Sequence, residues 1–240
     1  MLYIDGPLKN HRYNNNNSTN IKRKKVLNVL SEIEEIAKKN SLPSIGPIKG
    51  KIIGDIIKKY KPKRILEIGT LHGYSAILMT SFLLSVNDDD GGGDGGDGGN
   101  DNTVKEIIVT CLEIDKNLVN IAKKNIEKAG LSDRIEVITG DALDIIPKLN
   151  NHYRFDMVFI DAVKNQYLKY LKLVEESDLM NKEVAVVIAD NVLIYENEMK
   201  DYLEYVRNSG LYNSYTTETT LEFTKNVKDA LEVSLTANRD

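Results

Sequence analysis

Several features that would assign a function directly are scarce in this sequence. Only one of its 240 residues is a cysteine, Cys111, which excludes an intrachain disulfide and a zinc site made of several cysteines. The chain carries 32 Lys and Arg against 36 Asp and Glu, so it lacks the basic surplus with which nucleic-acid-binding proteins neutralise phosphates. We therefore expect no nucleic-acid partner.

Long apolar runs are also missing. The longest, residues 184–189, is far shorter than the roughly 20 residues that span a bilayer, and residues 1–20 contain no apolar segment typical of a signal peptide. A single cysteine agrees with a reducing compartment. We therefore expect a soluble, cytoplasmic protein without a membrane partner, present as a monomer or a homodimer.

The length and composition suit one large α/β domain or at most two small ones, with 41% hydrophobic and 28% charged residues. Two polar tracts differ from the rest: Asn, Ser and Thr fill residues 14–19, and Gly and Asp dominate residues 87–103. The spacing in the second tract matches neither an EF-hand nor the glycine-rich calcium repeat, so we interpret it as a solvated insertion. We expect a disordered extension at residues 1–21 and one domain at residues 22–240, with a disordered insertion at 87–103.

Apolar periodicity predicts the order of helices and strands. Two amphipathic helices are expected from apolar residues at helical spacing: Val26, Leu30, Ile33 and Ala37, then Ile48, Ile52, Ile56 and Tyr60. Expected strands lie at residues 64–68, 106–114, 135–138, 157–160 and 184–189. Expected helices lie at residues 74–84, 118–129, 143–149, 166–176 and 198–208, with Gly130 ending the second of these. This alternation predicts a doubly wound parallel sheet with helices on both faces.

The end of the chain has a different pattern. Residues 211–216, 221–223 and 230–235 are strand-like, with only turns between the last two. We expect an antiparallel hairpin there that closes the sheet. In such a fold, ligands bind beyond the carboxyl ends of the strands, so these positions are the ones to search for chemistry.

A glycine-containing segment, EIGTLHGYS at residues 67–75, follows the first expected strand. Gly69 and Gly73 would let the backbone approach a ligand, and Ser75 lies near the start of the next helix as a hydroxyl partner. The glycine spacing is not the G-x-G-x-x-G of a dinucleotide site, which argues against NAD. The carboxylate of Glu67 suits a ligand with an ammonium group and would repel a diphosphate.

Acidic residues also lie at the ends of the second and third expected strands. Glu113 is placed to accept hydrogen bonds from both ribose hydroxyls of an adenosine, with Ile114 beside the adenine ring. Asp115 has a second interpretation, as the N-cap of the following helix. Asp141 and Ala142 are placed to contact the edge of the adenine.

The fourth and fifth expected strands end in an oxygen-rich set. Asp161 follows one, and Asp190 with Asn191 follows the other, an oxygen-only donor set that suits magnesium and, without His or Cys, disfavours zinc. Each aspartate alone could instead cap a helix. Lys164 lies within reach of a hydroxyl bound there; burial beside a divalent cation would make it a base, whereas the alternative is a surface lysine. Glu222 either holds a second substrate hydroxyl or faces outward from its strand.

These segments together resemble the cation-dependent O-methyltransferases that use S-adenosylmethionine. The resemblance runs from about residue 22 to 235 and rests on EIGTLHGYSA, CLEID, GDALDIIPKL, MVFIDAVKNQYL, VIADN and TLEF. The TLEF segment resembles the catechol O-methyltransferases. Residues 161–164, followed by Tyr167, are more similar to the caffeoyl-CoA O-methyltransferases and their bacterial relatives.

The resemblance implies a Rossmann-like methyltransferase fold with a seven-stranded, mostly parallel sheet. The cofactor contacts that it implies are Glu67, Gly69, Ser75, Glu113, Ala142 and Asp161, with Ile45 closing over the cofactor. It further implies magnesium on Asp161, Asp190 and Asn191, Lys164 as the base, and Asn191 with Glu222 on the substrate hydroxyls. Two vicinal hydroxyls would then chelate the ion while one loses its proton.

The expected pocket walls differ from those of the catechol branch. Its aromatic and Met gatekeepers fall here on Ser41, Pro43 and Val163, its proline wall falls on Ile194 or Tyr195, its histidine is Ala162, and the chain has no tryptophan. The main hypothesis is a magnesium-dependent O-methyltransferase for a catechol-like small molecule. The alternatives are an O-methyltransferase for a bulkier, caffeoyl-CoA-like acceptor, or a non-catalytic protein that binds S-adenosylmethionine and regulates a partner.

Overall fold

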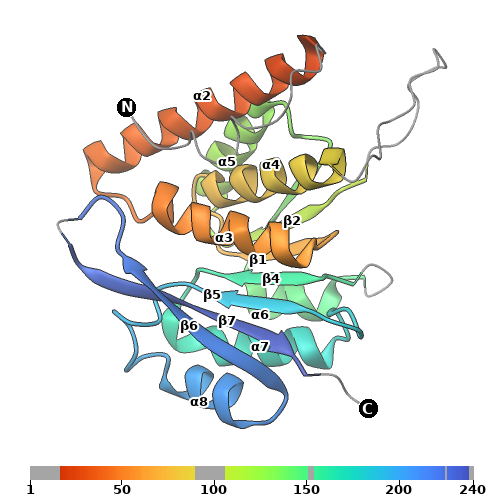
Figure 1. Ribbon diagram of the computed structural model, residues 1–240, viewed down its shortest axis with the longest axis vertical. Helices are drawn as coiled ribbons and strands as arrows, with labels where there is room; N and C mark the ends of the chain where they lie inside the picture. The colour runs from red at the N-terminus through yellow and green to blue at the C-terminus, as the bar shows by residue number, and fades with distance from the viewer. Residues whose placement is uncertain (1–16, 90–105, 151–153, 225, 238–240) are drawn as a thin grey trace.

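The structure is a computed structural model that describes residues 17–89, 106–150, 154–224 and 226–237. Seven strands form one sheet in the order β3-β2-β1-β4-β5-β7-β6 (Figure 1). The strands are β1 Ile65–Ile68, β2 Val109–Glu113, β3 Ile135–Thr139, β4 Met157–Ile160, β5 Val186–Ala189, β6 Tyr212–Thr220 and β7 Lys228–Thr236. The first five pair in parallel and β7 pairs antiparallel with both β5 and β6, which confirms the predicted sheet and its closing hairpin.

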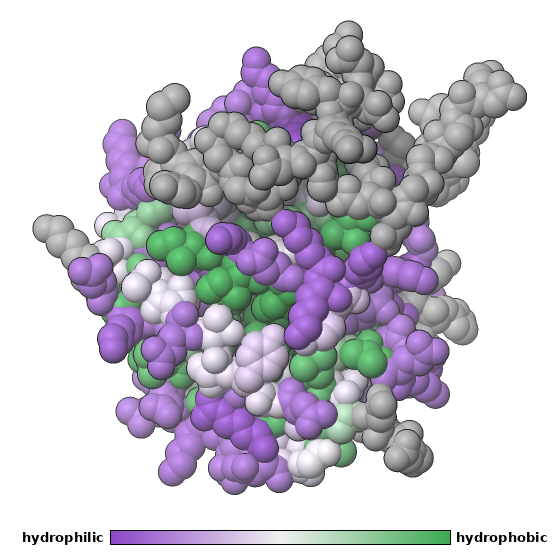
Figure 2. Space-filling model, viewed as in Figure 1, coloured by the Kyte–Doolittle hydropathy of each residue, from purple (hydrophilic) through white to green (hydrophobic). Residues whose placement is uncertain are grey.

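Helices cover both faces of the sheet. One layer contains α2 Asn17–Asn40, α3 Gly46–Tyr60, α4 Tyr74–Asp89 and α5 Lys116–Ala129. The other contains α6 Ala142–Ile145, α7 Tyr167–Glu176 and α8 Lys200–Asn208, with the short 3₁₀ helices η1 Ile146–Lys148 and η2 Lys164–Gln166. Among the described residues, no helix combines the length and the apolar character needed to cross a membrane. Hydrophilic side chains occupy much of the face seen in Figure 2, with hydrophobic side chains grouped near its centre.

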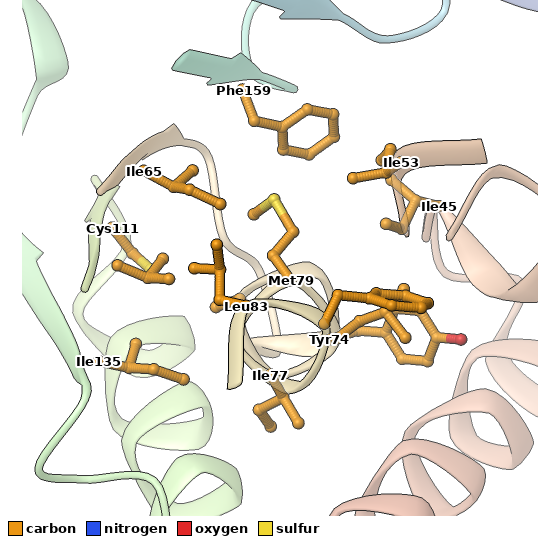
Figure 3. Packing of buried hydrophobic residues seen from close by; sticks show 14 of the residues in the cluster. Ile45, Ile53, Ile65, Tyr74, Ile77, Met79, Leu83, Cys111, Ile135 and Phe159 are labelled. Atoms are coloured by element: carbon orange, nitrogen blue, oxygen red, sulfur yellow. The ribbon is translucent and has the colours of Figure 1, made fainter. Parts of the chain in front are cut away.

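Alternating side chains of the central strands build two cores, because successive residues of a strand point to opposite faces. On β4, Met157 and Phe159 belong to the core under α3 and α4, whereas Val158 and Ile160 belong to the core under α7 and α8. Figure 3 shows Met79 of α4 pointing toward Phe159 across the first of these cores. Because the parallel strands are buried on both faces, they can be continuous apolar runs.

The buried face of α3 differs from the predicted one. Ile48, expected in the core, is 51% exposed, whereas Lys49, Gly50 and Gly54 are buried. A Cβ atom on Gly50 or Gly54 would lie 2.4 Å from Leu78 or 2.3 Å from the Phe82 ring of α4. Small residues on this face therefore let α3 and α4 approach closely, which a count of apolar positions does not reveal.

The hairpin is displaced from its predicted position. Residues 221–223 were expected to form a strand, but they lie in the turn between β6 and β7, and Phe223 has a φ of +58°. The apolar character of Leu221 and Phe223 comes from their position in the wall of a cavity described below. The strand prediction was wrong because these residues are apolar for a reason other than sheet packing.

The two polar tracts fall mostly outside the described residues. Residues 1–16 and 90–103 are not described, so the prediction of disorder there stays a prediction. Residues 17–21 belong to the first turns of α2, and residues 87–89 belong to the end of α4. Helix α2 therefore begins five positions before the expected start of the domain at residue 22.

Candidate active site

A cavity of about 740 Å³ lies at the carboxyl ends of the parallel strands. The predicted site residues in its wall are Ile45, Gly69, Ser75, Glu113, Ile114, Asp141, Ala142, Asp161, Lys164, Asp190, Asn191 and Glu222. Glu67 and Gly73 do not line it. The position beyond the strand ends is where doubly wound sheets bind their ligands.

The loop between β1 and α4 is fixed by a buried carboxylate. Glu67 is completely buried and accepts hydrogen bonds from the hydroxyls of Thr70, at 2.6 Å, and of Ser75. Burial raises the pKa of Glu67 to about 7, although these two hydroxyls act in the opposite direction. Ser75 donates its proton to Glu67, so the lone pairs of its oxygen stay available toward the cavity.

Gly69 is required at its position in this loop. Its φ is +88°, and a Cβ atom there would lie 2.2 Å from the carbonyl oxygen of Asp161. The amide of Asp161 in turn donates to the carbonyl of Ile68 at 2.9 Å. The end of β1 and the end of β4 are therefore in direct backbone contact, which brings the loop and Asp161 to the same wall of the cavity.

Glu113 at the end of β2 is held by backbone amides. It accepts hydrogen bonds from Leu71 at 3.0 Å, Thr70 at 3.3 Å and Asp115 at 3.0 Å. The first two bonds fall on Oε2 and the third on Oε1, so Oε1 keeps acceptor capacity for a ribose hydroxyl. Ile114 is 66% exposed in the cavity wall.

Both aspartates that follow β2 and β3 cap helices. Asp115 accepts from the amides of Asn117, at 2.7 Å, and Leu118, which confirms the N-cap interpretation. Asp141 accepts from the amide of Leu143 at 2.9 Å and also lines the cavity. A capping role therefore does not prevent Asp141 from contacting a ligand.

Lys164 points toward the acidic residues at the strand ends. Its Nζ donates to Asp161 Oδ1 at 2.8 Å and to Tyr167 Oη at 2.9 Å, and it lies 5.7 Å from the centre of the Tyr195 ring. Its side chain is 17% exposed. The structure therefore contradicts the alternative of an ordinary surface lysine.

Lys49, a residue that the sequence analysis missed, lies beneath this set. It is 1% exposed on α3, and its Nζ donates to Asp190 Oδ1 and to Asp229 Oδ2, each at 2.5 Å. Burial lowers the pKa of Lys49, but the two carboxylates outweigh this effect and raise it overall. Burial and the nearby charge of Asp161 raise the pKa of Asp190 to about 7, and Lys49 opposes that shift.

Glu222 lies in the hairpin turn with its carboxylate at the start of α3. Its Oε1 accepts from the amides of Ile48, at 2.5 Å, and Lys49, at 3.2 Å. A Cβ atom on Gly46, whose φ is +51°, would lie 2.6 Å from the Glu222 side chain. The alternative of an outward-facing strand residue is wrong, and burial raises the pKa of Glu222.

The donor set fits a hard cation bound through oxygen. Asp161 and Asp190 each use Oδ1 in the bonds given above, and among the described residues no hydrogen bond uses the Oδ2 atom of either. Asn191 uses Nδ2 to donate to Asp229. In the described part of the chain, no three His, Cys, Asp or Glu side chains form a metal cluster. A magnesium ion here would be bound by two carboxylates and an amide oxygen, completed by acceptor oxygens or water.

Three residues that matter for the site were not predicted: Lys49, Tyr167 and Asp229. Lys49 could have been found, because a charged residue between apolar positions on a helix indicates a buried, paired charge when it falls on the packed face. Asp229 carries no such signal. It is the second residue of β7, and only the three-dimensional structure brings it to Lys49.

Comparison with known proteins agrees with this geometry. A family model described as O-methyltransferase matches residues 104–215. Catechol O-methyltransferase B of Danio rerio is 33% identical over 195 residues, covering 80% of this chain and 65% of the relative. Catechol O-methyltransferase of Sus scrofa is 31% identical over 191 residues, covering 78% of this chain and 90% of the relative.

A solved structure supports the same assignment. The O-methyltransferase from Bacillus cereus, in complex with SAH, superimposes with a TM-score of 0.68 and 26% identity, covering 88% of this chain and 91% of that chain. The chain spans 61–65% of the length of three longer catechol O-methyltransferase relatives. Because it is 31% identical to the pig relative over 90% of that protein, the chain belongs to the O-methyltransferase family.

Proposed function

We propose that this protein transfers a methyl group from S-adenosylmethionine to one hydroxyl of a catechol-like small molecule, with a magnesium ion at the site. The observation that carries the proposal is that Lys164 lies beside Asp161 in the same cavity wall as Asp190, Asn191 and Glu222. A protein that only bound the cofactor would have no use for a lysine and oxygen ligands at this end.

The cofactor end of the cavity has the groups that S-adenosylmethionine requires. The lone pairs of Ser75 can accept from an ammonium group, and the buried carboxylate of Glu67 behind it favours a positive charge. Glu113 can accept from a ribose hydroxyl through Oε1, with Ile114 and Ala142 offering apolar contact to the adenine. These residues would therefore hold the amino-acid and nucleoside parts of S-adenosylmethionine at this end of the cavity.

At the acceptor end, Lys164 would remove a proton. The acceptor hydroxyl would give its proton to Lys164 Nζ, and the oxyanion would then attack the methyl carbon. The C–S bond breaks as the O–C bond forms, and sulfur keeps the electron pair, so the cofactor leaves as a neutral thioether. A magnesium ion held by Asp161, Asp190 and Asn191 would supply positive charge that favours the ionised hydroxyl.

The acceptor itself is proposed from the mouth of the cavity. Glu222 and Asn191 line the cavity with polar oxygens that suit two neighbouring hydroxyls. Val163 is 54% exposed and Tyr195 is 39% exposed at the wall, and this open apolar edge favours a second candidate, an acceptor with a bulky group beyond its ring. The cytoplasmic location, the monomeric or homodimeric state and the lack of nucleic-acid or membrane partners stay predictions.

A methyl-transfer assay tests the proposal. Labelled S-adenosylmethionine is supplied with 3,4-dihydroxybenzoate and magnesium, and in parallel with excess chelator. The control acceptor is 3-hydroxybenzoate, which has one hydroxyl and cannot chelate. We expect product only from the diol, and only when magnesium is present. Transfer only to a caffeoyl thioester would favour the bulkier acceptor, and cofactor binding without transfer to any diol would contradict an enzymatic role.

A further inference from the structure

Asp229 is connected to the proposed cation site through the side chain of Asn191. Asp229 lies at the start of β7 and is completely buried. It accepts hydrogen bonds from Lys49 Nζ at 2.5 Å and from Asn191 Nδ2 at 2.8 Å, and from the amide of Ile194 at 3.4 Å. A buried carboxylate is tolerated only when it is paired and hydrogen-bonded, and here Lys49 provides the counter-charge.

The bond to Asp229 fixes which way the Asn191 amide points. An ionised carboxylate can only accept hydrogen bonds, so it selects the NH₂ group of Asn191 and turns the carbonyl oxygen away. Asn191 also has a φ of +64°, a left-handed conformation that Asn tolerates better than most residues. Its side chain lies in the cavity wall with Asp161 and Asp190, so the amide oxygen is the atom offered on that side.

Lys49 donates hydrogen bonds to Asp190 and Asp229, the two acidic residues that also contact Asn191. Its ammonium donates to Asp229 Oδ2 and to Asp190 Oδ1, each at 2.5 Å. Asp190 Oδ1 accepts a further bond from the Asn191 backbone amide at 2.7 Å. The buried ammonium of Lys49 therefore helps to orient Asp190 directly and Asn191 through Asp229, two of the three side chains proposed to bind magnesium.

We propose that Asp229, held by Lys49, is a positioning residue that presents the carbonyl oxygen of Asn191 to a divalent cation. The inference rests on the magnesium site of the proposed function. It assigns to Asp229 an effect on cation affinity without contact with the cation, the substrate or the cofactor. Partners of metal ligands elsewhere typically change metal affinity about 10- to 100-fold when they are mutated.

The test variant is Asp229→Asn, which has nearly the same shape but can donate as well as accept, and so no longer selects one orientation of Asn191. The matched control is Glu232→Gln on the same strand, a buried acid that bonds to Arg207 rather than to the site. Mn²⁺ binding to the full chain with SAH present is followed by electron paramagnetic resonance, with Mg²⁺ as competitor. SAH affinity is measured separately by calorimetry.

We expect Asp229→Asn to weaken Mn²⁺ binding by about 10- to 100-fold while SAH affinity changes less than twofold. The control should bind both ligands like the wild type. If Asp229→Asn lowers only the melting temperature and leaves Mn²⁺ affinity within twofold, Asp229 is merely structural and the inference is overturned. If the wild type itself binds no Mn²⁺, both the inference and the magnesium site are overturned.

A second measurement covers the case in which Asp229→Asn does not fold. In the wild type, the side-chain NH₂ signals of Asn191 are assigned by their loss in Asn191→Ala, using ¹⁵N-labelled protein. We expect these signals to shift when Mg²⁺ is added, because the carbonyl oxygen of the same amide becomes a ligand. Signals that stay unchanged in a protein that binds Mn²⁺ would overturn the inference.

Discussion

The two ends of the cavity hold their functional groups in different ways. At the cofactor end, a buried acid is satisfied by its own loop: Glu67 accepts from Ser75, eight positions along the chain. At the acceptor end, Lys49 reaches Asp190 and Asp229 across 141 and 180 positions. Each end also has contacts of the other kind, since Glu113 accepts from Leu71 and Lys164 donates to Asp161 within one turn. The difference lies in the buried charge of each end: Glu67 is satisfied within its own loop, whereas Lys49 is paired only between distant elements.

This difference has consequences for how each end responds to mutation. Local contacts form when a short segment orders, because little chain entropy is lost in closing a small loop. Contacts between α3, β5 and β7 form only when the sheet is complete. We therefore expect changes at the acceptor end to alter stability and chemistry together, and changes at the cofactor end to have effects confined to the loop.

Replacing the proposed base should have the largest effect on the acceptor end. We expect Lys164→Met to lower the rate of methyl transfer about 10²- to 10⁴-fold, because proton removal is lost. The affinity for SAH should change less than twofold. Lys169→Met, on the exposed face of α7, is the control. Stopped transfer with an equal loss of SAH binding would mean that Lys164 belongs to the cofactor end.

Replacing the buried Lys49 tests whether the acceptor end also contributes to the free energy of unfolding. Lys49→Met leaves Asp190 and Asp229 buried without a counter-charge, so we expect the free energy of unfolding to fall by about 3–5 kcal/mol. Lys51→Met, exposed on the same helix, should stay within about 0.5 kcal/mol of the wild type. Chemical denaturation measures both. Equal stability of the two variants would remove the distinction between the ends.

The pH dependence of stability tests the cofactor end. Burial raises the pKa of Glu67 to about 7, so the folded protein binds its proton more tightly than the unfolded chain does. The stability linked to Glu67 is therefore complete below its unfolded pKa, about 4.3, and is lost as the pH rises to about 7. We expect this contribution to be at most about 4 kcal/mol, since one pKa unit corresponds to about 1.4 kcal/mol.

The measurement is denaturant unfolding at several pH values between 4.5 and 8. Glu67→Gln cannot ionise, so its loss of stability over this range should be smaller than that of the wild type. Glu127→Gln, on the exposed face of α5, should keep the wild-type slope. Parallel curves for the wild type and Glu67→Gln would show that Glu67 does not titrate in this range.

Alanine variants of two glycines test the comparison with the smallest expected effect. Gly69 and Gly130 both have positive φ values, +88° and +73°, so alanine is strained at either position by about 1–3 kcal/mol. Only at Gly69 would the new Cβ atom collide with Asp161, because nothing lies within 4 Å of a Cβ on Gly130. We expect Gly69→Ala alone to weaken SAH binding, measured by calorimetry. A similar loss in Gly130→Ala would mean that general destabilisation is responsible.

The predictable part of the molecule follows the same division. Strand and helix order, the N-cap at Asp115 and the end of α5 at Gly130 depend on short segments, and the sequence predicts them correctly. The carboxylates after β2 and β4 were also placed correctly in the cavity wall, because parallel strands bring their ends to one edge.

The missed part depends on tertiary contacts. The apolar residues Leu221 and Phe223 were interpreted as a strand because their contact with the cavity cannot be distinguished from sheet packing in one dimension. The packed face of α3 was misplaced because Gly50, Gly54 and Lys49 occupy it instead of large apolar residues. Their partners lie on α4, at the end of β5 and on β7, and no pattern within a short stretch of sequence indicates that these elements are in contact with α3.

The pairing of Lys49 with Asp229 can form only late in the synthesis of the chain. Asp229 is added to the growing chain 180 positions after Lys49, which takes roughly 10–40 s at ribosomal elongation rates of about 5–20 residues per second. Asp190, the other carboxylate partner of Lys49, is added earlier, 141 positions after Lys49, so Asp229 is the last of the two partners to arrive. The buried cluster around Lys49 is therefore completed only in the last stage of synthesis, when β7 has been added.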